Sequence, residues 1–203
     1  EKGYVTNSDF DRLTGRAAMN FHPKKWLNTG FTISGSHQKS NVTNGNASES
    51  YTNAFMFCRN IAPIYPVHLH NADGTYQLDS FGNKQYDSGS YTDENGNPVL
   101  TRNQYQDRHV IWENELNENK SFRNTLQSSA YMDLKFLNDF TFTVKGELNV
   151  RNNENRTYNS ALIGDGKGNN GRTKRTIYRY KNYTFQQQLN WNHTFGNHTV
   201  GVL

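Results

Sequence analysis

Polar and apolar residues alternate strictly along several segments of this chain, and residues 140–151 follow the pattern most clearly. Their odd-numbered positions are all polar or charged. The even-numbered positions are apolar or glycine: Phe140, Phe142, Val144, Gly146, Leu148 and Val150. Because successive side chains of a β-strand point to opposite faces, the segment predicts a strand with one apolar and one polar face. Transmembrane β-barrel strands have such faces, since one meets lipid and the other a watery lumen.

The same alternation predicts six strands, joined in turn by tight turns and by long polar loops. The predicted strands cover about residues 10–21, 26–39, 122–136, 140–152, 176–194 and 198–203, with loops over about 40–121 and 153–175. Proline has no N–H to donate, so the run His22-Pro23-Lys24-Lys25 is expected to break the first strand. Outer-membrane barrels place short turns on the periplasmic side and long loops outside, so both loops are predicted to be extracellular. The fold class is all-β, an antiparallel part of a larger transmembrane barrel.

The first long loop carries weaker local signals. Residues 48–60 predict a short helix with Ser48 as its N-cap, in which Cys58 is expected to be a small apolar contact. Residues 67–79 predict a small hairpin that turns at Gly74. Residues 113–119 fit either a short helix or a loop.

Composition supports β-structure without a large soluble core. Of the 203 residues, 33% are hydrophobic, below the usual share for a globular domain, yet the 13% of aromatic residues argues against disorder. The net charge is +4, and Lys and Arg are scattered rather than gathered in a stripe, so no nucleic-acid binding is expected. With a single cysteine the chain can form no internal disulfide. The sequence contains no run of about 18 apolar residues, so no membrane helix is predicted.

Both ends of the chain are those expected of a piece of a longer protein. It opens on Glu1 without a visible signal peptide and stops at Leu203 within a predicted strand. Such a piece leaves strand edges unpaired, so on its own it is expected to aggregate or to need detergent.

A soluble β-sandwich is the alternative fold, because its strands also alternate when one face packs on a second sheet. Sandwich loops are usually short at both ends, so the strict alternation of loop lengths favours the barrel. The apolar face discriminates between the two, since it forms a lipid-facing band in a barrel and is buried in a sandwich. The alternative function is a soluble carbohydrate-binding or adhesin-like β-domain.

Three stretches give the chain a family resemblance. They are residues 11–21 with 25–31, residues 60–67 (Asn-Ile-Ala-Pro-Ile-Tyr-Pro-Val) leading to 73–76, and residues 129–142. In these the sequence resembles the barrel region of SusC/RagA-type TonB-dependent outer-membrane transporters of Bacteroidetes. The resemblance covers essentially the whole chain, whereas the chain covers only a small part of a protein with a 22-stranded barrel, a plug and a TonB-contact segment.

The resemblance implies transport rather than catalysis. The full protein would lie in the outer membrane of a Gram-negative bacterium and import a large polar nutrient, most often an oligosaccharide, with peptides also possible. A SusD-like lipoprotein would cap it, and TonB would supply energy through a segment absent from this chain. Outer-membrane lipid would be its other partner, and no cofactor is implied.

Two sets of residues are candidates for contact with ligand or partner. In the first long loop, aromatic side chains among amides and carboxylates suit sugars or a lipoprotein interface, although they would equally suit a small core of the loop itself. These candidates are Tyr51, Phe55, Tyr65, Tyr76, Tyr86 and Tyr91. The charged positions of the polar strand faces are expected to line the lumen and contact ligand or plug. They are Arg12, Arg16, Lys135, Lys145, Glu147 and Arg151.

No catalytic or metal site is predicted. His68 and His70 could place two imidazoles on one face, but no third ligand is near in sequence, so they are interpreted as polar loop residues. Carboxylate pairs such as Glu113 and Glu115 could serve glycoside hydrolysis, but their interpretation is a solvated loop.

Overall fold

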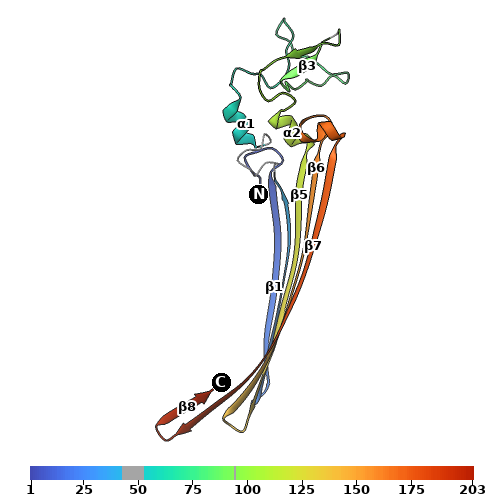
Figure 1. Ribbon diagram of the computed structural model, residues 1–203. Helices are drawn as coiled ribbons and strands as arrows, with labels where there is room; N and C mark the ends of the chain where they lie inside the picture. The colour runs from blue at the N-terminus through green and yellow to red at the C-terminus, as the bar shows by residue number, and fades with distance from the viewer. Residues whose placement is uncertain (43–52, 94) are drawn as a thin grey trace. The chain divides into compact units, whose positions relative to one another are not determined.

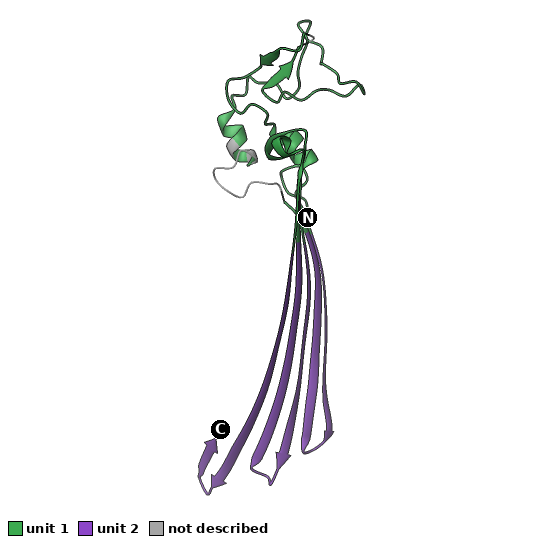
Figure 2. Ribbon diagram, turned by 45° about the vertical axis from the view of Figure 1, so that its right-hand side comes forward, with its two compact units in different colours: residues 1–10, 40–121, 155–176 green, residues 11–39, 122–154, 177–203 purple. Residues whose placement is uncertain are grey.

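The computed structural model describes residues 1–42, 53–93 and 95–203, which divide into two units (Figure 2). The sheet unit comprises residues 11–39, 122–154 and 177–203. The loop unit comprises residues 1–10, 40–121 and 155–176. Several of the long strands have residues in both units.

Six strands form one sheet (Figure 1). Each strand pairs with the strand of this sheet that comes before or after it along the chain. They are β1 (Asp9–Lys24), β2 (Leu27–Asn41), β5 (Glu118–Phe136), β6 (Phe140–Asn159), β7 (Arg172–Phe195) and β8 (His198–Val202). The order β1-β2-β5-β6-β7-β8 is that of an antiparallel meander, and it confirms the predicted all-β class with six strands. The sheet ends at β1 and β8 and does not close within this chain.

Five of the six strands are longer than the alternation predicts, and β8 is one residue shorter. β6 continues to Asn159 and β7 begins at Arg172, so only residues 160–171 remain outside the ladder in the second connection. β1 likewise runs through Pro23 to Lys24, so the strand ends within the run 22–25 that was expected to break it, three residues later than predicted. Pro23 lies one residue from the end of β1, an edge strand of this sheet, where a missing N–H is tolerated.

Two of the short connections turn through left-handed backbone. Leu137 and Asn138 have φ of 49° and 62°, as in the type I′ turns whose twist matches that of the flanking strands. Gly196, with φ of 59°, turns the chain from β7 into β8. Both lie at turn positions that the sequence predicts.

The apolar face of the sheet unit is uncovered. Leu13, Phe31, Leu148 and Tyr183 are 75%, 40%, 40% and 85% exposed. Among the described residues the one other sheet is the pair β3 (Ser90–Thr92) and β4 (Pro98–Leu100), which belongs to the loop unit. The apolar face therefore lacks the second sheet that a sandwich requires.

The buried side chains belong to the loop unit, as far as the described residues go. Its apolar core consists of Phe57, Leu69, Val110 and Ile163. Around it lie α1 (Ala54–Asn60), α2 (Val110–Leu116), the 3-10 helix η1 (Gly164–Asn169) and the β3–β4 pair.

Some of the local predictions for the first long loop agree with the structure and others do not. The turn at Gly74 is present, with a hydrogen bond of 3.0 Å from its N–H to the carbonyl of Asn71. The second helix lies three residues earlier than predicted, over Val110–Leu116. Cys58 is exposed rather than an apolar contact. Ser48 lies outside the described residues.

Neither α1 nor α2 nor any other helix in the described part of the chain is long and apolar enough to span a membrane.

Candidate functional site

Polar side chains from neighbouring strands meet on one face of the sheet unit, here called the polar face. It is formed by the even-numbered residues of β1, β2 and β7 and by the odd-numbered residues of β5 and β6. Asn28 of β2 donates to the Asp133 carboxylate of β5 at 2.9 Å, and Thr143 of β6 donates to the same carboxylate at 2.9 Å. These bonds tie three strands together through side chains as well as through the backbone.

Gly30 lets a side chain cross the polar face. The Tyr131 ring of β5 passes over Gly30 of β2, and its hydroxyl donates to the Asn20 side chain of β1 at 3.2 Å. A Cβ at Gly30 would collide with both Tyr131 and Asn20, so this crossing needs glycine at that position.

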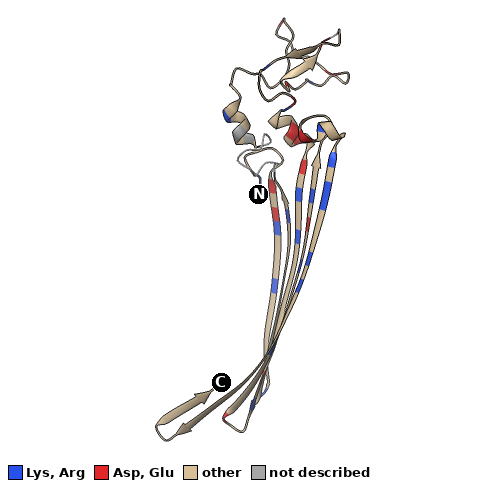
Figure 3. Ribbon diagram, viewed as in Figure 1, with Lys and Arg blue, Asp and Glu red and all other residues tan. Residues whose placement is uncertain are grey.

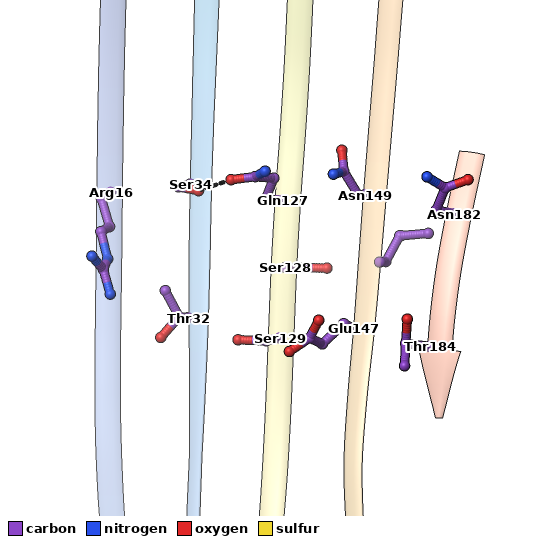
Figure 4. Close-up of a pocket in the computed structure, with 11 residues that line it drawn as sticks. Arg16, Thr32, Ser34, Gln127, Ser128, Ser129, Glu147, Asn149, Asn182 and Thr184 are labelled. Atoms are coloured by element: carbon purple, nitrogen blue, oxygen red, sulfur yellow. Dashed lines mark hydrogen bonds between the residues drawn. The ribbon is translucent and has the colours of Figure 1, made fainter. Parts of the chain in front are cut away.

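A pocket of about 530 Å³ lies on the polar face (Figure 4). Figure 4 shows Arg16, Thr32 and Ser34 from β1 and β2 opposite Glu147 and Asn149 from β6. Its lining also includes Gln127, Ser129, Asn182 and Thr184 of the polar face, together with Ser128 and Leu148, whose even-numbered positions on β5 and β6 belong to the apolar face. Hydroxyls, amides and one charge of each sign make this pocket suited to a polar, hydroxyl-bearing ligand.

A second groove, of about 670 Å³, shares Arg16, Ser34 and Gln127 with that pocket. Four guanidinium groups line it, from Arg12 and Arg16 of β1, Arg123 of β5 and Arg151 of β6. This arginine groove is completed by Thr14, Gly15, Gly35, Ser36, Gln38 and Thr125. Figure 3 shows the Lys and Arg positions distributed over the long strands.

The six predicted lumen residues all lie on the polar face. Arg12, Arg16, Glu147 and Arg151 line the two cavities. Lys145 lies on the same face, because its ammonium group is 2.6 Å from the Glu147 carboxylate. Lys135 lies two residues along β5 from Asp133 and therefore has the same orientation. Their role in a lumen stays a prediction.

A row of rings crosses the loop unit. The ring centroids of Trp112 and Tyr86 lie 5.5 Å apart, and the two rings are stacked. The centroid of the His68 ring lies 4.7 Å from that of Tyr86 and 5.9 Å from that of Tyr76, which continues the row. Burial raises the pKa of the Tyr86 phenol to about 12, and the hydrogen bond that it donates to Glu115 at 2.7 Å adds to the rise. The Lys84 ammonium group lies 3.7 Å from the centre of the Tyr76 ring, a cation–π contact.

Among the described residues, the row of rings includes two of the predicted aromatic loop residues, Tyr76 and Tyr86. Phe55 is 76% exposed on α1, and Tyr65 and Tyr91 are half-buried elsewhere in the loop unit. Tyr51 lies outside the described residues. Sequence reasoning missed Trp112 and His109 as ring partners of Tyr86, since only the fold of the loop brings residues 86 and 109–112 together.

Glu113 is buried, so its interpretation as a solvated loop residue was wrong. The residue is 1% exposed, and its carboxylate lies 3.1 Å from the Arg108 guanidinium and accepts the backbone N–H of His109 at 3.0 Å. Burial raises the pKa of Glu113 to about 7, and the Arg108 charge opposes that rise. The acidic residue in the first turn of α2 was the available sequence signal.

Ion pairs join the two long loops within the loop unit. Arg108 also pairs with Asp165 of η1 at 2.6 Å, and Lys167 of η1 pairs with Asp107 at 2.5 Å. Burial lowers the pKa of His109 to about 4, and the Arg102 charge contributes. A neutral His109 then caps α2, because its Nδ1 accepts the N–H of Trp112.

Within residues 1–42, 53–93 and 95–203, no arrangement of three His, Cys, Asp or Glu could bind a metal ion. His68 and His70 each pack against tyrosine rings instead.

The fold therefore defines an open antiparallel sheet with one exposed apolar face and one hollowed, charged face. Solved structures are similar to this chain in fold, and two of them are the following. The RagAB peptide importer in its closed-closed state is similar at 12% identity and a TM-score of 0.57, over 93% of this chain and 19% of that chain. A structure of the RagAB peptide transporter is similar at 11% identity and a TM-score of 0.56, over 94% and 19%.

At these identities the likeness establishes the fold, and this chain spans about a fifth of the matched chains. Neither a protein-family model nor a curated protein matches the sequence.

Proposed function

We propose that this chain is part of the barrel wall of a SusC/RagA-type TonB-dependent outer-membrane transporter that imports a large polar nutrient. In this proposal the apolar face meets lipid and the polar face lines the lumen. The short turns lie on the periplasmic side, and the loop unit is extracellular.

The two unlike faces of the open sheet carry the proposal. Apolar side chains such as Phe31 and Leu148 stay exposed along one face, and no described residue packs a second sheet on them. The strands β1 to β7 of this sheet have 15 to 24 residues, more than the roughly 9–11 that span a bilayer. Phe136 and Phe140 stack at 5.4 Å beside the turn that joins β5 to β6, as expected for an interfacial aromatic belt.

We propose an oligosaccharide as the nutrient, taken up together with a SusD-like surface lipoprotein. The pocket linings support this substrate, because hydroxyl and amide side chains dominate them and match the hydroxyls of sugars. The similar RagAB structures are those of a peptide importer, so a peptide is the competing substrate. The exposed Phe55 and Tyr76 of the loop unit are the side chains proposed to contact ligand or lipoprotein.

Fractionation of cells that make the full-length protein tests the location. We expect it in the outer membrane, with faster gel migration before heating than after, as closed barrels show. Recovery in a soluble fraction would contradict the transporter and favour the soluble carbohydrate-binding domain.

Uptake tests the substrate. Cells with the intact gene and cells lacking it are compared for uptake of neutral oligosaccharides, acidic oligosaccharides and peptides of matched size. Oligosaccharide uptake that depends on both the gene and TonB is expected. Gene-dependent uptake of peptides alone would replace the sugar with a peptide and leave the transporter in place.

A further inference from the structure

The arginine groove on the polar face gathers positive charge without a counter-charge. Its lining contains four arginines and, among the described residues, no carboxylate. Arg12, Arg16 and Arg151 form no salt bridge within the described part of the chain, and Arg123 donates only to the neutral Asn153 amide, at 3.2 Å. All four side chains are exposed. An anion that enters the groove would therefore meet four cations that are free of protein carboxylates.

Guanidinium groups favour oxyanions. Their planar N–H donors match carboxylates, and likewise phosphates, through paired hydrogen bonds, which are stronger than bonds between neutral groups. The volume of about 670 Å³ lies in the range of ligand sites.

The rest of the lining selects against peptides with apolar side chains. Between the arginines stand the hydroxyls and amides of Thr14, Ser34, Ser36, Gln38, Thr125 and Gln127. No aromatic or large aliphatic side chain lines the groove, so nothing there would bury an apolar peptide side chain. The adjoining pocket continues the polar lining through Arg16, Ser34 and Gln127, and so offers room for further sugar units.

We propose that the arginine groove binds the carboxylates of an acidic, uronate-type oligosaccharide. The proposal rests on the proposed function and narrows its substrate class. A neutral sugar would satisfy the hydroxyls and amides but leave the four guanidinium groups without anionic partners. A uronate chain supplies both the hydroxyls and a carboxylate on each unit.

Binding to the full-length protein, purified in detergent, tests the proposal. Isothermal titration calorimetry compares a galacturonic acid hexamer with its methyl ester, which has the same sugars and no charge. We expect the acid to bind roughly tenfold or more tightly than the ester, and its affinity to fall as salt is raised. Equal affinity for acid and ester would overturn the proposal.

Variants assign the binding to the groove. The double variant Arg12→Gln/Arg16→Gln is expected to lose roughly tenfold or more in affinity for the acid, because charge-assisted hydrogen bonds are removed. Lys39→Gln is the control for loss of positive charge outside the groove, since Lys39 alternates onto the opposite face of β2. It loses one positive charge, so its affinity is compared with that of the single variant Arg12→Gln, which also loses one. Unchanged affinity in the double variant would overturn the proposal.

Heat-modifiable migration checks that each variant folds, and the single variant Arg123→Gln gives a second test if the double variant does not fold.

Two other occupants of the groove would give different results in these experiments. A glutamate hexamer that binds as tightly as the sugar acid would replace the sugar with an acidic peptide. No binding in the wild type, with a lower melting temperature in the variants, would mean that carboxylates of the same protein occupy the groove. Either result overturns the proposal.

These measurements do not depend on uptake. Loss of the charge preference would leave the transporter standing. Recovery of the full-length protein in a soluble fraction would remove the transporter but leave binding to the groove measurable.

Discussion

At Gly164 the backbone has a φ of +72°, and a Cβ there would collide with the buried Glu113 carboxylate. The Gly164 N–H also donates to the carbonyl of Asp107 at 3.1 Å. A single residue thus sets how closely η1 approaches the segment before α2. The ion pairs of Arg108 and Lys167 with Asp165 and Asp107 depend on that approach.

The substitution Gly164→Ala is therefore expected to loosen the loop unit. Left-handed backbone costs alanine about 1–2 kcal/mol, and the overlap with Glu113 adds about 1–3 kcal/mol. Hydrogen exchange of the full-length protein should become at least about tenfold faster in residues 105–117 and 160–171. Gly168→Ala in the same 3-10 helix is the control, since nothing lies within 4 Å of a Cβ there. Equal exchange in both variants would show that the contact is not important.

Each long strand has an apolar and a polar face, as two adjacent residues of β6 show. Leu148 of β6 is 40% exposed on the apolar face, whereas Asn149 lines the pocket on the polar face. The strand itself is continuous through both residues. Position along the strand therefore determines which solvent a side chain meets, and a shift by one residue would exchange the two faces.

Arginine at these two positions should have opposite consequences for assembly. In a bilayer, Leu148→Arg places a charge against lipid and is expected to cost up to about 2–4 kcal/mol, depending on depth. Asn149→Arg places the same side chain on the watery face, at little cost. The measurement is the fraction of full-length protein in the outer membrane that migrates faster before heating. Comparable assembly of both variants would contradict a lipid-facing surface at Leu148.

At the scale of the whole chain, the sheet is an open piece without a core of its own. β1 and β8 are its outer strands, and β8 pairs only with residues 191–195 of β7. Most of β7 is thus left with one unpaired edge in this chain. Unpaired edges next to an exposed apolar face promote association with other chains.

Residues 1–203 produced alone are expected to aggregate or to require detergent. Unpaired backbone groups and exposed side chains such as Leu13 and Phe185 would otherwise meet water. Size-exclusion chromatography with and without detergent measures this directly. A stable monomer in plain buffer would contradict the barrel and favour a soluble domain, whereas detergent-dependent dispersion would agree with the barrel.

Strand identity and the two faces were determined by the sequence itself. Successive side chains of a strand point to opposite faces, so an alternation with a period of two follows directly from strand geometry. Residues 140–151 therefore specify both the strand and its two faces without tertiary context. The turn over residues 137–139 is equally local, because three residues between alternating segments leave room for little but a hairpin.

Only the tertiary structure decided where strands end, which loop residues are buried and which strand residues share a groove. Strand pairing carries β6 on to Asn159 after the apolar alternation has stopped, since ladder hydrogen bonds do not depend on apolar side chains. Glu113 and Arg108 are buried because the loop folds back on η1, a contact between residues more than 50 positions apart. Arg123 joins Arg12 and Arg16 only through the pairing of β1, β2 and β5, because register between distant strands is a property of the assembled sheet.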